Sequence, residues 1–304
     1  MLIQSAALVA DAGFTFGDVI HEYVEFVGTF FIVGAISFYF LLLRPALATN
    51  RSSMSTAARI AARIGIAGAL LRALAVGMSA GSTMAAKHVT FLSALTRRPS
   101  AVVGELAILI ALLGFARASR ESRDAIGAWI IAAIATIVVA LRGVITTDLH
   151  DIVNPVHVFA ASMWIGTLFV LVVAGLSTML SHELAEADRG PLVAVLVGRF
   201  STIALWAAGV LVLTGVTTAT LHLGSVSALW TSIYGKTLIV KLCVVACVMT
   251  LGAYNNRRLK PTLGTSTAGA RLRRSASFEI ALAALVLGIT AVLVNLPAPA
   301  EHLH

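Results

Sequence analysis

The chain has 304 residues, of which 59% are hydrophobic and only 12% carry a charged side chain. A soluble domain is about 25% charged, so this composition excludes an ordinary globular protein and predicts an integral membrane protein embedded in a lipid bilayer. The net charge of +8 does not indicate nucleic-acid binding, because the basic residues gather in short connections, where they face lipid head groups.

The apolar segments predict an all-α integral membrane protein with eight transmembrane helices, since most of them approach the ~20 residues that cross a bilayer. No segment between them is large enough for a nucleotide-binding domain, so we expect neither an ATP-driven pump nor another enzyme. The predicted spans are, in chain order, Val24–Leu43, Ile60–Ala80, Val102–Ala116, Ile126–Leu141, Pro155–Leu180, Phe200–Leu221, Gly235–Tyr254 and Ser277–Leu296.

The basic residues predict the orientation of these spans. Lys and Arg number 15 in and beside the four connections that follow the odd-numbered helices, against six on the opposite side. Positive charge collects on the cytoplasmic side, so we expect a multi-pass protein of the inner (plasma) membrane with both termini periplasmic or extracellular. Of the eight histidines only His182 is then inside, and the outer ones are His21, His88, His150, His157, His222, His302 and His304.

A faint internal repeat divides the chain. His21 and His157 are 136 residues apart, as are Arg63 and Arg199, and His88 precedes His222 by 134. We therefore expect two four-helix halves, 1–149 and 150–304. Repeats of this kind place a transport site at the interface between the halves.

The first helix carries a polar face. Asp18, His21, Glu22 and Glu25 follow one another at i, i+3, i+4 and i+7, so they share one side of the helix. This face is either a polar cap exposed to water or an imidazole–carboxylate metal site, in which Glu25 binds the ion or orients His21. Arg72, within the second span, should pair with a carboxylate, either Glu25 or Glu105.

Soft and imidazole ligands follow at the outer ends of later helices. Met78, Met84 and His88 form a Cu(I)-type ligand set, although methionine in a membrane helix is often only filler. In the connection before the fifth span, His150, Asp151 and His157 could approach one cation, or His150 could be a solvated loop residue. His222 ends the sixth span on the same side.

The two cysteines, Cys243 and Cys247, are one helical turn apart in the seventh span. They could form a Cu(I) relay between the halves or could simply pack against a neighbouring helix.

From residue 150 onward the chain resembles the copper resistance protein D (CopD) family, whose membrane domain also occurs in YcnJ-type copper import proteins. Glu279 matches the acidic residue that begins the last helix of the family, and the first four helices match only in number and in the outer histidine. The stretches that carry the resemblance are His157–Gly166, Arg199–Ala204, Leu213–Val216, Tyr234–Lys241 and Asn255–Arg257 followed by Pro261.

The resemblance implies a membrane protein that moves copper inward, beside a separate periplasmic copper-binding partner of the CopC type. Only His157 is carried over by its motif position, while the other ligands rest on the residue patterns above. Two alternatives stay open. Paired histidines from facing helices could bind haem b in a redox protein, because His21, His88, His157 and His222 are expected at similar depth. The chain could also deliver copper for oxidase assembly without transporting it.

Overall fold

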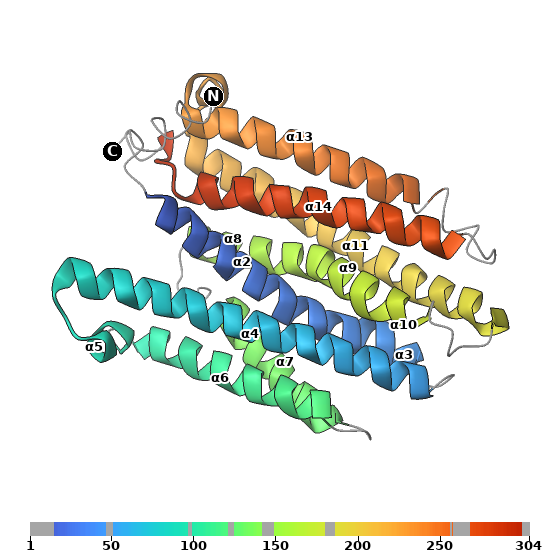
Figure 1. The fold of residues 1–304 in the computed structure, drawn as a ribbon. Coiled ribbons are helices and arrows are strands. Elements are labelled where there is room, and N and C mark those ends of the chain that lie inside the picture. The colour runs from blue at the N-terminus through green and yellow to red at the C-terminus, as the bar shows by residue number, and fades with distance from the viewer. Residues whose placement is uncertain are drawn as a thin grey trace.

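The computed structural model describes residues 15–46, 51–96, 99–120, 125–141, 149–179, 186–255, 257 and 268–299. Within these ranges every regular element is a helix, and the long helices lie side by side in one bundle (Figure 1). The predicted all-α class is therefore confirmed. His182, His302 and His304 lie outside the described residues, as does the side chain of His150.

The N-terminal part of the bundle consists of four long helices and two short ones. Helix α2 (Phe16–Ser37) continues through a π-helical turn, η1 (Phe38–Leu43), into α3 (Arg44–Ala46). It begins at a capping box, in which the Thr15 hydroxyl accepts from the Asp18 amide and the Asp18 carboxylate accepts from the Thr15 amide. The remaining elements are α4 (Arg51–Lys87), α5 (Phe91–Leu95), α6 (Pro99–Arg120) and α7 (Ile126–Leu141).

The C-terminal part begins with a rod of short α- and π-helical pieces in direct succession. These are α8 (Leu149–Ala161), η3 (Ser162–Gly166), α9 (Thr167–Val170), η4 (Leu171–Leu176) and α10 (Ser177–Met179). Helix α8 starts six residues before Pro155, so His150 and Asp151 lie in the helix and not in the predicted connection. The rod is followed by α11 (Glu186–Leu223), α12 (Ala228–Thr231), α13 (Ile233–Tyr254) and α14 (Ala268–Val294).

Seven of the helices in the described ranges are long and apolar enough to cross a membrane. The fourth predicted span corresponds to α7, an apolar helix of 16 residues that is shorter than the others. The chain is thus a multi-pass helical membrane protein. The seven spans are Phe16–Leu43, Ser55–Lys87, Ala101–Arg120, Asp151–Leu176, Gly190–Leu223, Ile233–Tyr254 and Arg273–Val294.

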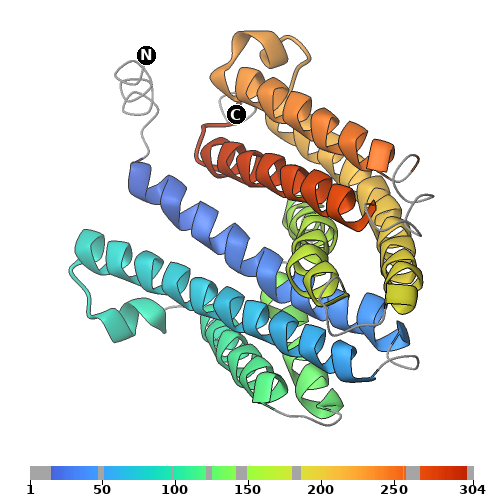
Figure 2. The same cartoon turned by 45° about the vertical axis from the view of Figure 1, so that its right-hand side comes forward.

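Helix α2 lies at the centre of the bundle, with α4 on one side and η3, α9 and α14 on the other (Figure 2). Its second half and η1 supply much of the main core, including Ile32, Phe38 and Leu42. Tyr39 stacks on Trp129 of α7 with ring centroids 4.1 Å apart. The buried second half of α2 is anchored in this core, while the polar residues at its beginning are half-buried or exposed.

The crossing of α2 and the α8–α10 rod is a direct contact between two backbones. A Cβ atom at Gly34 would overlap the backbone of Gly166, and one at Gly166 would overlap the carbonyl oxygen of Phe30. Only glycine permits this approach, which is typical of tightly packed membrane helices. Helix α2 and the α8–α10 rod therefore meet through a glycine contact in the last third of α2.

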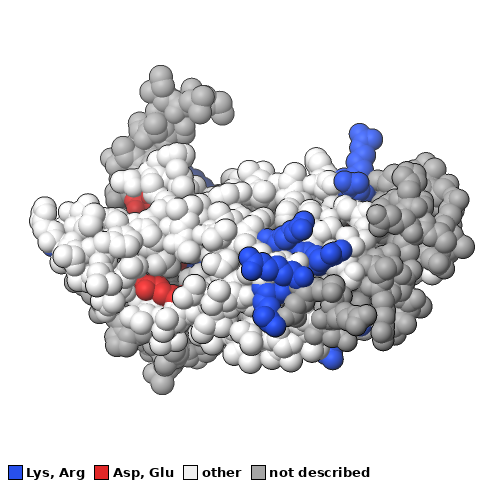
Figure 3. All heavy atoms as spheres, turned by 60° about the horizontal axis from the view of Figure 1, so that its bottom comes forward, with Lys and Arg blue, Asp and Glu red and all other residues white. Residues whose placement is uncertain are grey.

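Exposed arginines mark one end of the bundle, which we call the basic end. Figure 3 shows Lys and Arg gathered toward one end of the face in view and carboxylates nearer the other. The opposite end, where α2 begins and α4 and α11 finish, is called the histidine end. This asymmetry agrees with the charge pattern that predicts the orientation in the membrane. The exposed arginines of the basic end are Arg44, Arg59, Arg63, Arg117, Arg120, Arg199, Arg257, Arg273 and Arg274.

Candidate functional site

A linked set of charged groups joins α2 to α4 at the histidine end. His21 Nδ1 lies 3.5 Å from a Glu22 oxygen, and His21 Nε2 lies 3.9 Å from Glu25 Oε2. The other oxygen of Glu25 forms an ion pair with Nη1 of Arg72, whose side chain is only 3% exposed. Glu25 is therefore shared between an imidazole and a buried guanidinium.

Close packing of α2 on α4 brings these charges together. A Cβ at Gly68 would lie 2.7 Å from Cβ of Phe31, and one at Gly28 would lie 3.0 Å from Cγ of Arg72. Because neither glycine has a side chain, the two helices approach closely enough for Arg72 to reach Glu25. Arg72 thus has the carboxylate partner expected of it, and that partner is Glu25.

His157 of α8 is held by a hydrogen bond to α11. Its Nδ1 lies 2.8 Å from the hydroxyl of Thr214, and this hydroxyl donates to the carbonyl of Val210 at 2.7 Å. A threonine hydroxyl has one proton, and when that proton goes to Val210 the hydroxyl accepts from Nδ1–H, which leaves the lone pair of the neutral ring on Nε2. The ring is half-buried and lies against Gly215. This is the orientation that a second hydrogen bond gives to a metal-binding imidazole.

His222, at the end of α11, has a different environment. Its Nδ1–H donates to the carbonyl of Thr218 at 2.9 Å, and its ring is stacked on Tyr234 with centroids 5.7 Å apart. His157 contacts Thr214, whereas the His222 ring turns back to Thr218, four residues further along α11. The similar depth on which the haem alternative rests stays a prediction.

The remaining predicted ligands of the histidine end are not gathered into one cluster. Met78 is half-buried, while Met84 and His88 are exposed, and His88 ends α4 with a positive φ of 51°. Asp151 is half-buried on α8. In the part of the chain that the structure describes, no group of three or more His, Cys, Asp or Glu side chains is placed to hold a metal ion.

The two cysteines lie on the outside of the bundle. Cys243 and Cys247 are both exposed on α13, which packs mainly on α14 and α12 at the edge of the structure (Figure 1). A path between the two halves would not pass these thiols, so the placement argues against the predicted relay.

One polar cluster was not predicted. Glu279, which the resemblance places at the start of the last helix, is buried and accepts a hydrogen bond from Asn255 Nδ2. The side-chain amide oxygen of Asn255, Oδ1, in turn accepts from the Ser275 hydroxyl at 2.7 Å. The sequence could have indicated that Glu279 is a candidate functional residue, because an acidic side chain inside a membrane span is rare. It did not show that the partner of this side chain is on another helix.

Comparison with known proteins finds one matching family model and one curated relative. Residues 194–293 match the family model described as copper resistance protein D. The copper transport protein CutJ of Bacillus subtilis (strain 168) is 30% identical over 145 residues, which is 48% of this chain and 25% of that relative. The chain thus aligns with only a quarter of the length of this relative, and no solved structure matches it significantly. The predicted resemblance to the copper resistance protein D family is confirmed, and its matched region runs from α11 into α14.

Proposed function

We propose that this chain carries copper ions inward across the plasma membrane and is a transporter, not an enzyme. The observation that carries the proposal is the bond between His157 and Thr214, which directs the Nε2 lone pair of a half-buried imidazole away from the anchoring threonine. The family match supports copper as the ion, and its matched region includes Thr214. Imidazole nitrogen is a good ligand for copper.

In this proposal the histidine end faces the periplasm or the cell exterior. A copper ion would meet His157 and the pair formed by His21 and Glu25, with Met78, Met84, His88, His150 and His222 as further ligands on the same side. Glu25 can bind a cation only by sharing the carboxylate that now neutralises Arg72. A membrane potential favours entry by about 2.3 kcal/mol per charge per 100 mV. The ion would be supplied by a separate copper-binding protein of the CopC type.

Copper flux into proteoliposomes tests the proposal. The purified chain, reconstituted in lipid vesicles that contain a copper-sensitive dye, should admit copper faster than protein-free vesicles. His157→Ala should reduce this rate, because it removes the ligand that Thr214 orients. Wild-type protein that admits no more copper than empty vesicles, in either oxidation state of the ion, would contradict transport by this chain.

Thr214→Val should weaken copper binding by roughly 10–100-fold, the range found when the hydrogen-bond partner of a metal-binding histidine is removed. Valine has the shape of threonine but cannot accept from Nδ1–H, so the imidazole loses its anchor. Thr217→Val is the matched control, because the Thr217 hydroxyl donates to the Leu213 carbonyl within the same helix. Copper titration of both variants provides the measurement, and equal affinities would show that Thr214 does not orient a ligand.

A further inference from the structure

A buried carboxyl group lies close to the basic end, away from the candidate copper ligands of the histidine end. Glu279 is 3% exposed, and the Asn255 side chain that donates to its Oε1 is 7% exposed. Gly252 lies on the other side of the carboxyl group. A Cβ atom added at Gly252 would lie 3.7 Å from Oε2 of Glu279 and would meet no other described side chain within 4 Å. Oε1 thus has a fixed donor, and a glycine leaves space beside Oε2.

No cation among the described residues neutralises this carboxyl group. Helix α13, packed against it, presents Asn255, while Tyr254 and Arg257 beside this residue are exposed, and α9 and η4 contain no titratable side chain. The titratable residues of α2 all lie in its first ten residues, at the histidine end. Arg273 and Arg274 of α14 itself are exposed. An ionised carboxylate in such a place is costly, and uptake of a proton removes that cost.

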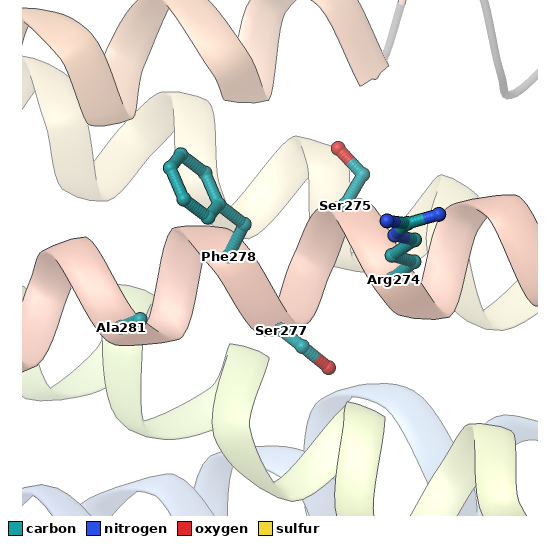
Figure 4. A pocket seen from close by; sticks show the side chains of 5 residues that line it. All are labelled: Arg274, Ser275, Ser277, Phe278 and Ala281. Atoms are coloured by element: carbon teal, nitrogen blue, oxygen red, sulfur yellow. The ribbon is translucent and has the colours of Figure 1, made fainter.

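The cluster continues toward the water of the basic end. Ser275, which donates to Asn255, lies one helical turn before Glu279 and lines an open hollow with Arg274, Ser277 and Phe278. In Figure 4, Ser275 and Phe278 project from α14 toward the side on which α13 lies, and Ser277 projects to the opposite side. Polar groups therefore connect a surface hollow to the buried acid.

We infer that Glu279 is a proton-binding site of this membrane domain, filled from the basic end. Its carboxylate takes up one proton from water at Oε2 and its charge changes from −1 to 0, and release returns the proton to the same side. Asn255 can donate to Oε1 in both states, so the cluster holds the group while its charge changes. On the basis of the proposed function, we also assign this proton exchange to the copper transport cycle.

Infrared spectroscopy tests the site without any copper. Difference spectra of the purified chain between acidic and alkaline buffer should contain the C=O band of a protonated carboxylic acid, which should disappear in Glu279→Gln. Glu105→Gln, which changes a half-buried carboxylate on α6, is the control and should leave the band in place. A band that persists in Glu279→Gln, or no such band in the wild type, would overturn the assignment.

A second variant covers the case in which Glu279→Gln does not fold. Gly252→Ala puts a methyl group 3.7 Å from Oε2 and should shift the frequency of the same band. An unchanged band in Gly252→Ala would contradict protonation at Oε2.

The link to transport needs a separate measurement. In proteoliposomes, an imposed pH gradient should change the initial rate of copper uptake severalfold for the wild type but not for Glu279→Gln. If the pH gradient does not change copper uptake by the wild type, the coupling between proton exchange and copper transport is refuted. The transport function and the proton-binding site are not affected by that result. If the wild type admits no copper at all, the proposed function fails, whereas the infrared result is unaffected.

Discussion

Glu25→Ala is expected to lower the free energy of unfolding by about 3–5 kcal/mol, the usual effect of removing one partner of a buried ion pair. The change leaves the guanidinium of Arg72, with a side chain only 3% exposed, without the carboxylate that neutralises it. Arg72 Nε already lacks a hydrogen-bond partner among the described atoms, so little else compensates for the loss. Thermal unfolding in detergent, followed by size-exclusion chromatography, measures the effect.

Glu22→Ala is the matched control for this prediction. Glu22 is 26% exposed and Glu25 is 28% exposed, but Glu22 contacts His21 and not Arg72. Its loss should change stability by less than about 1 kcal/mol, as for other exposed pairs. The double variant Glu25→Ala/Arg72→Met should recover much of the lost stability, because no buried charge is left. Equal destabilisation by Glu22→Ala and Glu25→Ala would show that the ion pair between Glu25 and Arg72 does not account for the loss of stability.

Gly166→Leu is expected to prevent accumulation of folded protein. Ordinary overpacking costs about 1–3 kcal/mol because side chains can move aside. At Gly166 the obstacle is the carbonyl oxygen of Phe30 and the backbone of Gly34, so relief requires α2 and the α8–α10 rod to separate. Separation would open the core on both sides of α2. The measurement is the yield of monodisperse protein after extraction from the membrane.

Two other glycines serve as controls for the crossing. Gly209 and Gly288 lie in α11 and α14, and a Cβ at either position would meet no described atom within 4 Å. Substitution of each by alanine should be neutral or stabilising by about 0.5–1 kcal/mol, because alanine is the better helix former. Gly166→Ala should already be harmful. A Gly166→Ala variant as stable as Gly209→Ala would contradict the close contact between the two backbones.

Hydropathy predicted the order of the apolar helices, since length and composition determine whether a segment can cross a bilayer. Seven of the eight predicted spans correspond to helices long enough to cross, and the fourth corresponds to the shorter α7. The boundaries were less predictable. The third helix was expected over Val102–Ala116 but extends to Pro99–Arg120, because helical structure continues through polar residues at the membrane surface. The fifth was expected to begin at Pro155 but begins at Leu149, so Pro155 lies inside the helix. Membrane helices tolerate an interior proline because neighbouring groups satisfy the backbone carbonyl that it leaves free.

The contacts between helices could not be predicted in the same way. In a membrane protein both the core and the lipid-facing surface are apolar, so the pattern does not say which face of a helix is buried. Cys243 and Cys247 were therefore considered for a central relay, although both are exposed on α13. The pairing of Arg72 with Glu25 was one of two options in the sequence, and the choice depends on Gly28 and Gly68.

The copper content of the purified protein tests the central claim most directly. Elemental analysis after incubation with copper and removal of the unbound ion should find nearly one copper per chain in the wild type. His157→Ala should lose most of it, His21→Ala should lose some, and His182→Ala, which changes the histidine expected on the inner side, should retain it. A wild type without copper, or equal copper in wild type and His157→Ala, would contradict a copper site at the histidine end.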